Sequence, residues 1–360
     1  MEAEGLIRRA RGHDGRIRPA GAIRSGPMTA RGNEGRSPGV ALVTGISGQD
    51  GSYLAEALVQ RGWSVHGLLR PGHSWSGEGV TIHVGDLTNS DRLAAVVRET
   101  APDVIYNLGG ISSVGYSWNE PYDTALVTGA APIALMDAAL QLQRSEGKAV
   151  RFFQASSAEI FGAASAPQSE STPRAPISPY GVAKSMAHAA VAVFRSQGLA
   201  ASAGILFNHE SVRRPPSFVT RKITLGAAAI KLGLRTELVL GNLNAQRDFG
   251  WAPDYVEAMI AIAGAEEPDD FVIATGVAHS VREFAEAAFA SAGLGEIDRY
   301  LRIDARFSRA ADAPTMRGDA SKIARVLGWK ASTSFEDVAR KMVEHDLAWL
   351  QEHGDQGLNL

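Results

Sequence analysis

The chain contains no cysteine among its 360 residues. It therefore has no disulfide framework, no thiolate metal ligand and no cysteine nucleophile. A composition without cysteine fits a reducing compartment, and we expect a cytoplasmic protein. The sequence also lacks a stretch of 18 apolar residues, so we expect no membrane span.

An excess of positive charge is absent too, because the formal net charge at pH 7 is -3. Nucleic-acid-binding domains are usually basic, so we do not expect nucleic acid as the main partner. The histidines are scattered, and His209 has no second histidine at the H-E-x-x-H spacing of a zinc site. We therefore predict no metal. A hydrophobic content of 45% is ordinary for a globular protein of one or two domains.

Residues 1 to 38 are rich in arginine and glycine and show no hydrophobic periodicity. This composition predicts a disordered leader, and the continuous apolar core of a secretory signal is missing. A basic nucleic-acid arm and a transit peptide are two functional alternatives. The plain alternative is an extension without function, with Met28 as the actual start.

The rest of the chain alternates predicted strands and helices. Strands are expected at 40–44, 65–69, 80–84, 103–106, 150–154, 203–207, 237–240 and 271–274. Helices are expected at 90–99, 122–142, 180–195, 219–232, 253–265, 280–293, 320–327 and 335–352. This alternation predicts an α/β fold with a Rossmann-type, doubly wound parallel sheet. We expect a cofactor-binding domain at 39–207 and a smaller, mostly α substrate-binding domain at 208–360, with a segment near 241–275 returning to the sheet.

A glycine-rich turn, Gly45-Ile46-Ser47-Gly48-Gln49-Asp50-Gly51, follows the first predicted strand and precedes a helical pattern. Glycines let the backbone approach a pyrophosphate at a helix N-terminus, where free N–H groups and the helix dipole favour anions. The G-x-x-G-x-x-G spacing differs from that of many dehydrogenases, and chance spacing is the alternative. The flanking strand and helix favour dinucleotide binding.

Arg70 ends the second predicted strand, where an NAD site usually has an acidic residue for the ribose 2′-hydroxyl. An arginine suits a 2′-phosphate and favours NADP, with a surface arginine as the alternative. Asp86 follows the third strand and is placed either to contact the adenine or to cap the next helix. Leu108-Gly109-Gly110 follows the fourth strand, and small residues there suit close approach of a cofactor.

Tyr180 and Lys184 are four residues apart in a predicted helix, so their side chains share one face. An ammonium beside a phenol favours the phenolate, which predicts a Tyr180 pKa below about 10 and proton exchange with an alcohol. The alternative is an amphipathic helix with a snorkelling lysine.

Ser157 and Glu159 follow the strand at 150–154 and face the same side in an extended chain. Open α/β sheets bind ligands at the carboxyl ends of their strands, which is where both residues lie. A helix cap or turn is the alternative for Ser157, and a solvated loop acid is the alternative for Glu159.

Six cationic residues follow position 208, namely Arg213, Arg214, Arg221, Lys222, Arg247 and Arg309. Arginine binds phosphate through two parallel hydrogen bonds, so an anionic diphosphate would engage several of them. The alternative is a solvated surface on which these charges share no focus.

Several long segments together resemble the extended short-chain dehydrogenase/reductase superfamily and, more narrowly, the GDP-mannose 4,6-dehydratase family. The likeness runs from about Val40 to about residue 350. Its most specific pieces are ALVTGISGQDGSYLAE at 41–56, QASSAEIFG at 154–162, SPYGVAK at 178–184 and ILFNHES at 205–211.

The resemblance implies intramolecular redox dehydration of GDP-mannose to GDP-4-keto-6-deoxy-mannose with bound NADP. The cofactor would be held by Gly45, Gly48, Gln49, Asp50, Arg70, Asp86, Leu87, Leu108, Tyr180 and Lys184. The catalytic residues would be Ser157, Glu159, Tyr180 and Lys184, and the nucleotide-sugar would be held by Asn208, Lys222, Arg247 and Arg309. The family forms homodimers or homotetramers, with helices such as 122–142 and 180–195 packing between subunits.

This chain departs from the family pattern in four places. Ser157 stands where the family usually has threonine, and Asp312 stands for a usual glutamate near Arg309. The segment 110–114 reads GISSV where the family typically has AQSHV, and the loop 71–79 is shorter and lacks a second arginine. Alternatives therefore remain: a 4,6-dehydratase of another NDP-sugar such as GDP-heptose, a related reductase or epimerase, and a cofactor-binding protein without turnover. Glu159 favours elimination, because simple reduction needs no base at the sugar C5.

Overall fold

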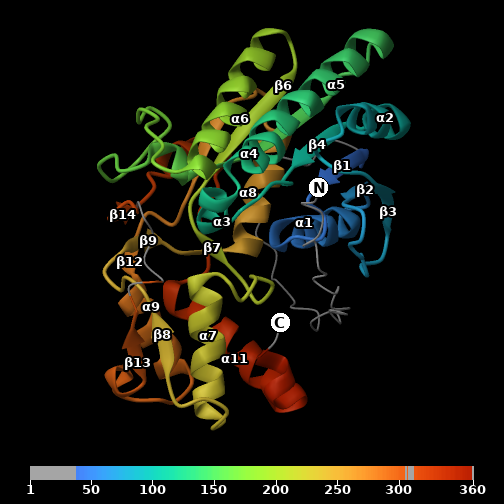
Figure 1. Cartoon of the computed structure of the whole chain (residues 1–360). Coiled ribbons are helices and arrows are strands. Elements are labelled where there is room, and N and C mark those ends of the chain that lie inside the picture. The colour runs from blue at the N-terminus through green and yellow to red at the C-terminus, as the bar shows by residue number, and fades with distance from the viewer. Residues whose placement is uncertain (1–37, 305, 307–311, 359–360) are drawn as a thin grey trace, which may run out of the picture.

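The computed structural model describes residues 38–304, 306 and 312–358. Arg309 and nearly all of the predicted leader lie outside the described residues. The core of the fold is a seven-stranded parallel sheet with the order β11-β6-β5-β4-β1-β2-β3 (Figure 1). Its strands are β1 (Val40–Thr44), β2 (Ser64–Leu69), β3 (Val80–Val84), β4 (Val104–Asn107), β5 (Arg151–Ser157), β6 (Ala200–Leu206) and β11 (Asp270–Ile273).

Alternate residues of each central strand pack into different cores, as expected for a sheet that is covered on both faces. In β1, Ala41 and Val43 join a cluster with α1 (Gln49–Gln60) and α8 (Ala252–Gly264). Leu42 joins a cluster with α2 (Ser90–Thr100) and α5 (Ala131–Glu146), which also includes residues of α6 (Pro179–Ser196). The α/β, doubly wound fold predicted from the sequence is therefore confirmed.

The strand order reverses between β1 and β4, because β2 lies on one side of β1 and β4 on the other. In open α/β sheets, the ligand crevice lies at such a reversal, outside the carboxyl ends of the strands. Both the glycine-rich turn after β1 and Leu108 after β4 follow strands at this point. The topology therefore positions the predicted cofactor residues together.

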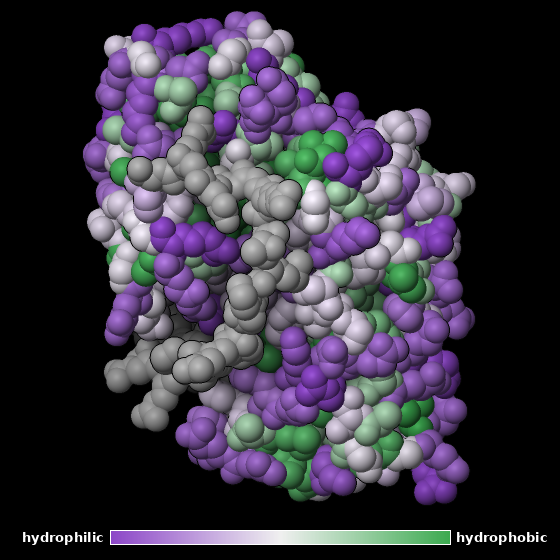
Figure 2. Space-filling model, turned by 180° about the vertical axis from the view of Figure 1, so that it is seen from behind, coloured by the Kyte–Doolittle hydropathy of each residue, from purple (hydrophilic) through white to green (hydrophobic). Residues whose placement is uncertain are grey.

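A long helical run covers the sheet on the α6 side. It comprises α4 (Pro121–Thr124), a π-helical segment η1 (Ala125–Ala130) and α5. The run Pro121–Glu146 is apolar and long enough to cross a membrane, yet 56% of its most apolar window is buried inside the fold. Such burial is typical of a core helix. On the face seen in Figure 2, hydrophobic residues form separate patches among hydrophilic ones.

The chain after β6 builds a second core of helices and short strands, which lies below the sheet in Figure 1. Its helices are α7 (Val219–Lys231), α9 (Val281–Ser291) and α11 (Phe335–His353). Short strands join it: β8 (Leu238–Leu240) pairs with β13 (Leu301–Ile303), and β9 (Gln246–Asp248) lies between β12 (Ala278–Ser280) and β14 (Thr315–Met316). The chain crosses between the two parts through β7 (His209–Glu210), which pairs with β10 (Gly250–Trp251).

Three further helical segments complete the description: α3 (Val114–Asn119), α10 (Ser321–Leu327) and the 3-10 helix η2 (Ala158–Phe161), with short 3-10 turns at Ile297–Arg299 and Gly354–Leu358. The sequence pattern did not predict α3.

Asp86 is not a helix cap, because the Oδ1 atom of Asn89 accepts from the Arg92 N–H at 2.9 Å and caps α2. The Asp86 carboxylate instead accepts from the N–H and hydroxyl of Thr88, at 2.9 and 2.7 Å. The capping alternative for Asp86 is therefore wrong.

Candidate active site

The turn after β1 has no room for side chains at two of its glycines. Gly45 has a φ of 69°, and a Cβ atom there would lie 2.8 Å from the backbone nitrogen of Gly109. A Cβ atom at Gly51 would lie 2.2 Å from the carbonyl oxygen of Gly45. Helix α1 then begins after Gly48 without a side-chain cap, so no side chain satisfies its first N–H groups. A pyrophosphate fits this uncapped N-terminus beside a tightly packed glycine turn.

The predicted adenosine-side residues gather at the carboxyl edge of the sheet. Arg70 is exposed at the end of β2, and its Nε lies 3.1 Å from the Nε2 of His73. The hydrogen bonds from Thr88, together with the nearby Arg70 charge, lower the pKa of Asp86. Leu87 packs so closely against Gly109 that a Cβ atom there would be 2.8 Å from the leucine Cδ1. The structure thus brings Arg70 near Asp86, and Leu87 near the turn that carries Leu108.

Helix α6 presents Tyr180 and Lys184 toward the end of β5. The helix starts sharply, because the Ser178 hydroxyl accepts from the Gly181 N–H at 3.1 Å and Pro179 occupies the first turn. The Tyr180 N–H donates to the hydroxyl of Ser117 in α3 at 3.1 Å. Lys184 donates from Nζ to the carbonyl oxygen of Ala155 at 2.8 Å. Both ends of the catalytic turn are therefore fixed by buried hydrogen bonds.

Ser157 and Glu159 lie beside this helix turn. The Ser157 hydroxyl hydrogen-bonds to the phenol of Tyr180 and also accepts from the Glu159 N–H at 3.3 Å. Ser157 thus caps η2, as the structural alternative predicted, and it also contacts the tyrosine. The charge of Glu159 is close enough to Tyr180 to oppose ionisation of the phenol. The structure brings all four predicted catalytic residues together.

The prediction that Tyr180 has a lowered pKa is wrong for this structure. Burial raises the pKa of Tyr180 to about 12, although the hydrogen bond from Ser157 opposes the shift. Burial also lowers the pKa of Lys184 to about 8, against the attraction of Asp50. The Lys184 ammonium lies 5.8 Å from the centre of the tyrosine ring and points at Ala155 instead. Desolvation therefore outweighs the expected stabilisation of the phenolate.

The cations of the second core serve different roles. Arg247 is buried in β9, where its guanidinium donates to the Ala313 carbonyl at 2.9 Å and to the Asp312 carboxylate at 2.5 Å. Lys222 is partly buried on α7, and burial lowers its pKa. Asn208 directly precedes β7, and its carbonyl accepts from the Gly250 N–H at 2.8 Å. Arg309 lies outside the described residues.

Besides Arg247, three more of the six cations have carboxylate partners. Arg221 pairs with buried Asp346 at 2.7 Å, and Arg213 pairs with Glu56 at 2.8 Å. Arg214 lies 3.2 Å from the carboxylate of Glu210. Arg221 and Arg213 are therefore held by carboxylates and largely covered, rather than lying on the solvated surface that the alternative described. Sequence reasoning also missed Ser117, for which a lone serine before a predicted helix gives no local signal.

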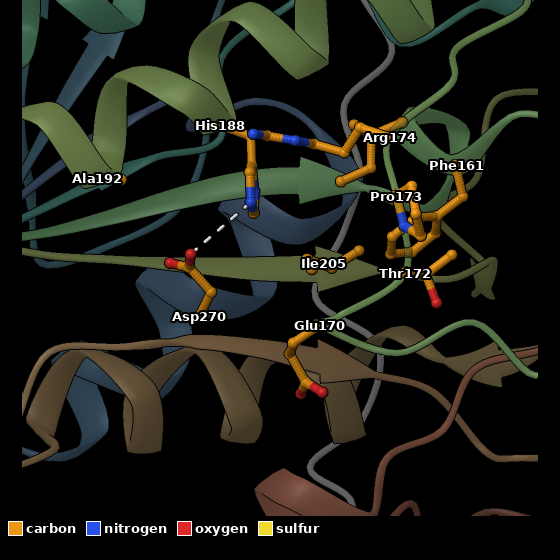
Figure 3. Close-up of a pocket in the computed structure, with 10 residues that line it drawn as sticks. Phe161, Glu170, Thr172, Pro173, Arg174, His188, Ala192, Ile205 and Asp270 are labelled. Atoms are coloured by element: carbon orange, nitrogen blue, oxygen red, sulfur yellow. Dashed lines mark ion pairs between the residues drawn. The ribbon is translucent and has the colours of Figure 1, made fainter.

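A separate cavity of about 370 Å³ is shown with its lining residues in Figure 3. Its lining includes His188 of α6, Asp270 of β11, and Glu170 and Arg174 of the loop before α6. The His188 ring bridges two strands, with Nδ1 3.1 Å from the Ser156 hydroxyl and Nε2 3.7 Å from the Asp270 carboxylate. None of the predicted site residues that the structure describes lines this cavity.

The parallel sheet, the glycine turn at α1 and the Ser–Tyr–Lys set at the end of β5 define an enzyme of the extended short-chain dehydrogenase/reductase class. A family model for GDP-mannose 4,6 dehydratase matches residues 42–342. The chain belongs to the GDP-mannose 4,6-dehydratase family, as the sequence predicted.

Named relatives span most of both chains. GDP-mannose 4,6 dehydratase 2 from Arabidopsis thaliana is 43% identical over 324 residues, which are 86% of this chain and 87% of that protein. GDP-mannose 4,6-dehydratase from Vibrio cholerae is 40% identical over 355 residues, or 87% and 95% of the two chains.

Two solved structures share the fold at low identity. The Thermus thermophilus UDP-glucose 4-epimerase complex with NAD has a TM-score of 0.74 and 23% identity, covering 85% of this chain and 98% of that one. The structure of RMD from Pseudomonas aeruginosa with NADPH has a TM-score of 0.72 and 22% identity, covering 86% and 99%.

Proposed function

We propose that this protein converts GDP-mannose to GDP-4-keto-6-deoxy-mannose by intramolecular redox dehydration, with NADP as its cofactor. The observation that carries the proposal is the meeting of Ser157, Glu159 and Tyr180 at the end of β5, in a chain of this family. A hydroxyl, a carboxylate and a phenol in one place provide the groups that both oxidation and elimination need.

The order of the chemistry follows from the acidity of the sugar. The C5 proton of a hexose is not acidic, but a ketone at C4 makes it acidic because the enolate spreads the charge. Tyr180 therefore accepts the C4 hydroxyl proton, and Ser157 donates a hydrogen bond to the C4 oxygen. Glu159 removes the C5 proton and helps the C6 hydroxyl to leave as water. When bound, NADP would store the hydride that leaves C4 and returns to C6. The proton that Tyr180 took from the C4 hydroxyl is then returned to C5, which completes the 6-deoxy product and restores the enzyme.

The charge of Lys184 controls the proton transfer at Tyr180. Burial favours a neutral phenol, whereas the reaction needs a phenolate to accept the alcohol proton. Lys184 carries its proton below a pKa of about 8, and an ammonium one helical turn away stabilises the phenolate. We therefore assign Lys184 to the support of Tyr180 and to contact with the cofactor.

NADP, rather than NAD, is proposed because Arg70 ends β2 in the place of an acidic residue. Together with the uncapped N-terminus of α1, it provides two anion-binding features at one edge of the sheet. The proposed contacts are those expected from the sequence: Gly45, Gly48, Gln49, Asp50, Arg70, Asp86, Leu87, Leu108, Tyr180 and Lys184 for the cofactor, and Asn208, Lys222, Arg247 and Arg309 for the GDP-sugar.

Purified protein incubated with GDP-mannose, without added reductant, tests this function directly. We expect a product that has lost one water, detected by mass spectrometry, with no net reduction of NADP. No product from GDP-mannose, but turnover of another NDP-sugar such as a GDP-heptose, would overturn the proposed substrate. Net formation of NADPH would instead indicate a simple dehydrogenase.

A homodimer or homotetramer is the second part of the proposal, and an apolar stripe on α6 supports it. Val182, Met186 and Val193 are 56%, 44% and 60% exposed and occupy one face, with exposed Ala189 between them. Tyr122 at the start of the neighbouring helical run is 73% exposed. Apolar residues at this spacing suit helix packing between subunits.

Light scattering after gel filtration measures the subunit number. Val182→Glu together with Met186→Glu should produce monomers, because two buried charges would be unpaired at the interface. Val326→Glu is the matched control, since Val326 is 55% exposed on α10. A wild-type monomer would contradict the proposal.

The division into a cofactor-binding part at 39–207 and a substrate-binding part at 208–360 also remains a proposal, as does a cytoplasmic location. Residues 1 to 38 are proposed to be a leader that catalysis does not need. Deletion of residues 1–37 should leave turnover of GDP-mannose unchanged. A large loss of activity would show that the leader belongs to the enzyme.

A further inference from the structure

Asp50 and His209 form a buried ion pair between the glycine turn and β7. The Oδ2 atom of Asp50 lies 2.9 Å from Nε2 of His209, and Nδ1 of the same ring lies 2.7 Å from the Phe207 carbonyl oxygen. A carbonyl oxygen only accepts, so Nδ1 carries a hydrogen. Nε2 faces a carboxylate and carries one too, so the ring is an imidazolium. Burial opposes both charges, but mutual attraction still lowers the pKa of Asp50 and raises that of His209.

The neighbouring residues join the same two segments. Gln49 donates from Nε2 to the His209 carbonyl at 3.1 Å and accepts from the Ser211 hydroxyl at 2.8 Å. Arg213 donates to the Ser52 hydroxyl at 3.0 Å. The side chains of Gln49 and Asp50 are thus directed at the segment 209–211, which leaves the backbone of the turn to face an anion.

Other groups surround the imidazolium. Its ring stacks on Tyr255 of α8, with ring centres 4.6 Å apart. The Arg214 charge acts against protonation of His209, and Arg214 itself lies 3.2 Å from Glu210. Removal of the Asp50 charge would therefore leave the His209 imidazolium near the Arg214 cation, and His209 would lose the carboxylate that compensates its charge.

We propose that Asp50 and His209 are positioning residues. Their ion pair holds the phosphate-binding turn at 45–51 in a fixed position against the segment 208–211, so the affinities for NADP and for the GDP-sugar both depend on it. This inference rests on the proposed function in one respect: that NADP binds at 45–51 and the GDP-sugar binds next to Asn208. On one side, the pair adjoins the first N–H groups of α1. On the other side, it adjoins Asn208, whose carbonyl accepts a hydrogen bond from the Gly250 N–H.

The two ligand sites are tested separately with NADP and GDP as probes, by titration calorimetry on the full chain. Asp50→Asn and His209→Gln should each weaken both affinities by tenfold or more. The double variant should lose less than the product of the single effects, because neither charge is then left unpaired. Circular dichroism and thermal melting establish whether each variant is folded. If a single variant does not fold, the affinities of the double variant are compared with those of the wild type instead.

Three control variants separate positioning from direct contact. Arg70→Ala should weaken NADP binding alone, and Lys222→Ala should weaken GDP binding alone. Glu56→Gln removes the exposed partner of Arg213 and should leave both affinities unchanged.

If Asp50→Asn weakens NADP binding while GDP binding stays normal, Asp50 acts only as a cofactor contact and the inference is overturned. Strictly multiplicative effects in the double variant would also overturn it. A wild-type protein that binds neither probe contradicts the proposed function, whereas wild-type binding with unequal losses contradicts only the role of the ion pair.

Discussion

The buried pair of Arg221 and Asp346 offers the sharpest test of stability. Arg221 of α7 is 3% exposed and Asp346 of α11 is fully buried, with 2.7 Å between Nη2 and Oδ1. The Asp346 carboxylate also accepts from the Thr224 hydroxyl at 2.7 Å. Arg221→Met keeps much of the volume but leaves the buried carboxylate without its cation.

The size of the effect follows from this burial. Removing one partner of a buried ion pair costs about 3–5 kcal/mol, because the remaining charge is uncompensated. For a chain of this length, the entropy of unfolding means that each 1 kcal/mol lost from the free energy of unfolding lowers the melting temperature by about 1.4 °C. The melting temperature of Arg221→Met should therefore fall by about 4–7 °C. Scanning calorimetry or thermal circular dichroism measures the shift.

Two controls make this prediction specific. Arg340→Met removes an exposed arginine that pairs with Asp337 and Glu344, and it should leave the melting temperature nearly unchanged because solvent screens these pairs. The double variant Arg221→Met, Asp346→Leu should recover most of the loss, because it removes both charges. An unchanged melting temperature in Arg221→Met, or a normal melt with greatly weakened GDP binding, would refute the structural role of Arg221 and favour a ligand contact.

Three other predictions concern the site. Glu159→Gln should lower the rate of water loss by about 10²–10⁴-fold, because a base for the C5 proton is removed; normal product formation by mass spectrometry would contradict that role. The value of kcat/KM should rise with pH up to about 8 and then level off, because above that pH Lys184 loses its supporting proton as fast as the Tyr180 phenolate becomes populated; a rate that keeps rising in proportion to hydroxide up to pH 9.5 would contradict the need for the cation. Gly51→Ala should weaken NADP binding by at least tenfold, since its Cβ atom would lie 2.2 Å from the Gly45 carbonyl oxygen. Calorimetry checks this, and unchanged NADP binding would contradict it. Gly295→Ala is the matched control, because a Cβ atom there would meet no atom within 4 Å and Gly295, like Gly51, does not have a left-handed φ.

The sequence by itself determined the sheet, the glycine turn and the residues that we propose to be catalytic. These features depend on local pattern: strands and helices have fixed side-chain periods, and residues such as Gly45 and Pro179 restrict the backbone wherever they occur. The carboxyl ends of parallel strands meet at one edge, so Ser157 and the turn after β1 could be placed together before the structure was known.

Only the tertiary structure decided the properties that depend on burial and on distant partners. Tyr180 has a raised pKa because the packed site removes water from the phenol, which no residue spacing reveals. Arg221 is a structural cation because α11 brings Asp346 against it, and Asp50 faces His209, which is 159 residues further along the chain. Such pairings are set by the packing of whole elements, so each charge can be read from the sequence but its partner cannot.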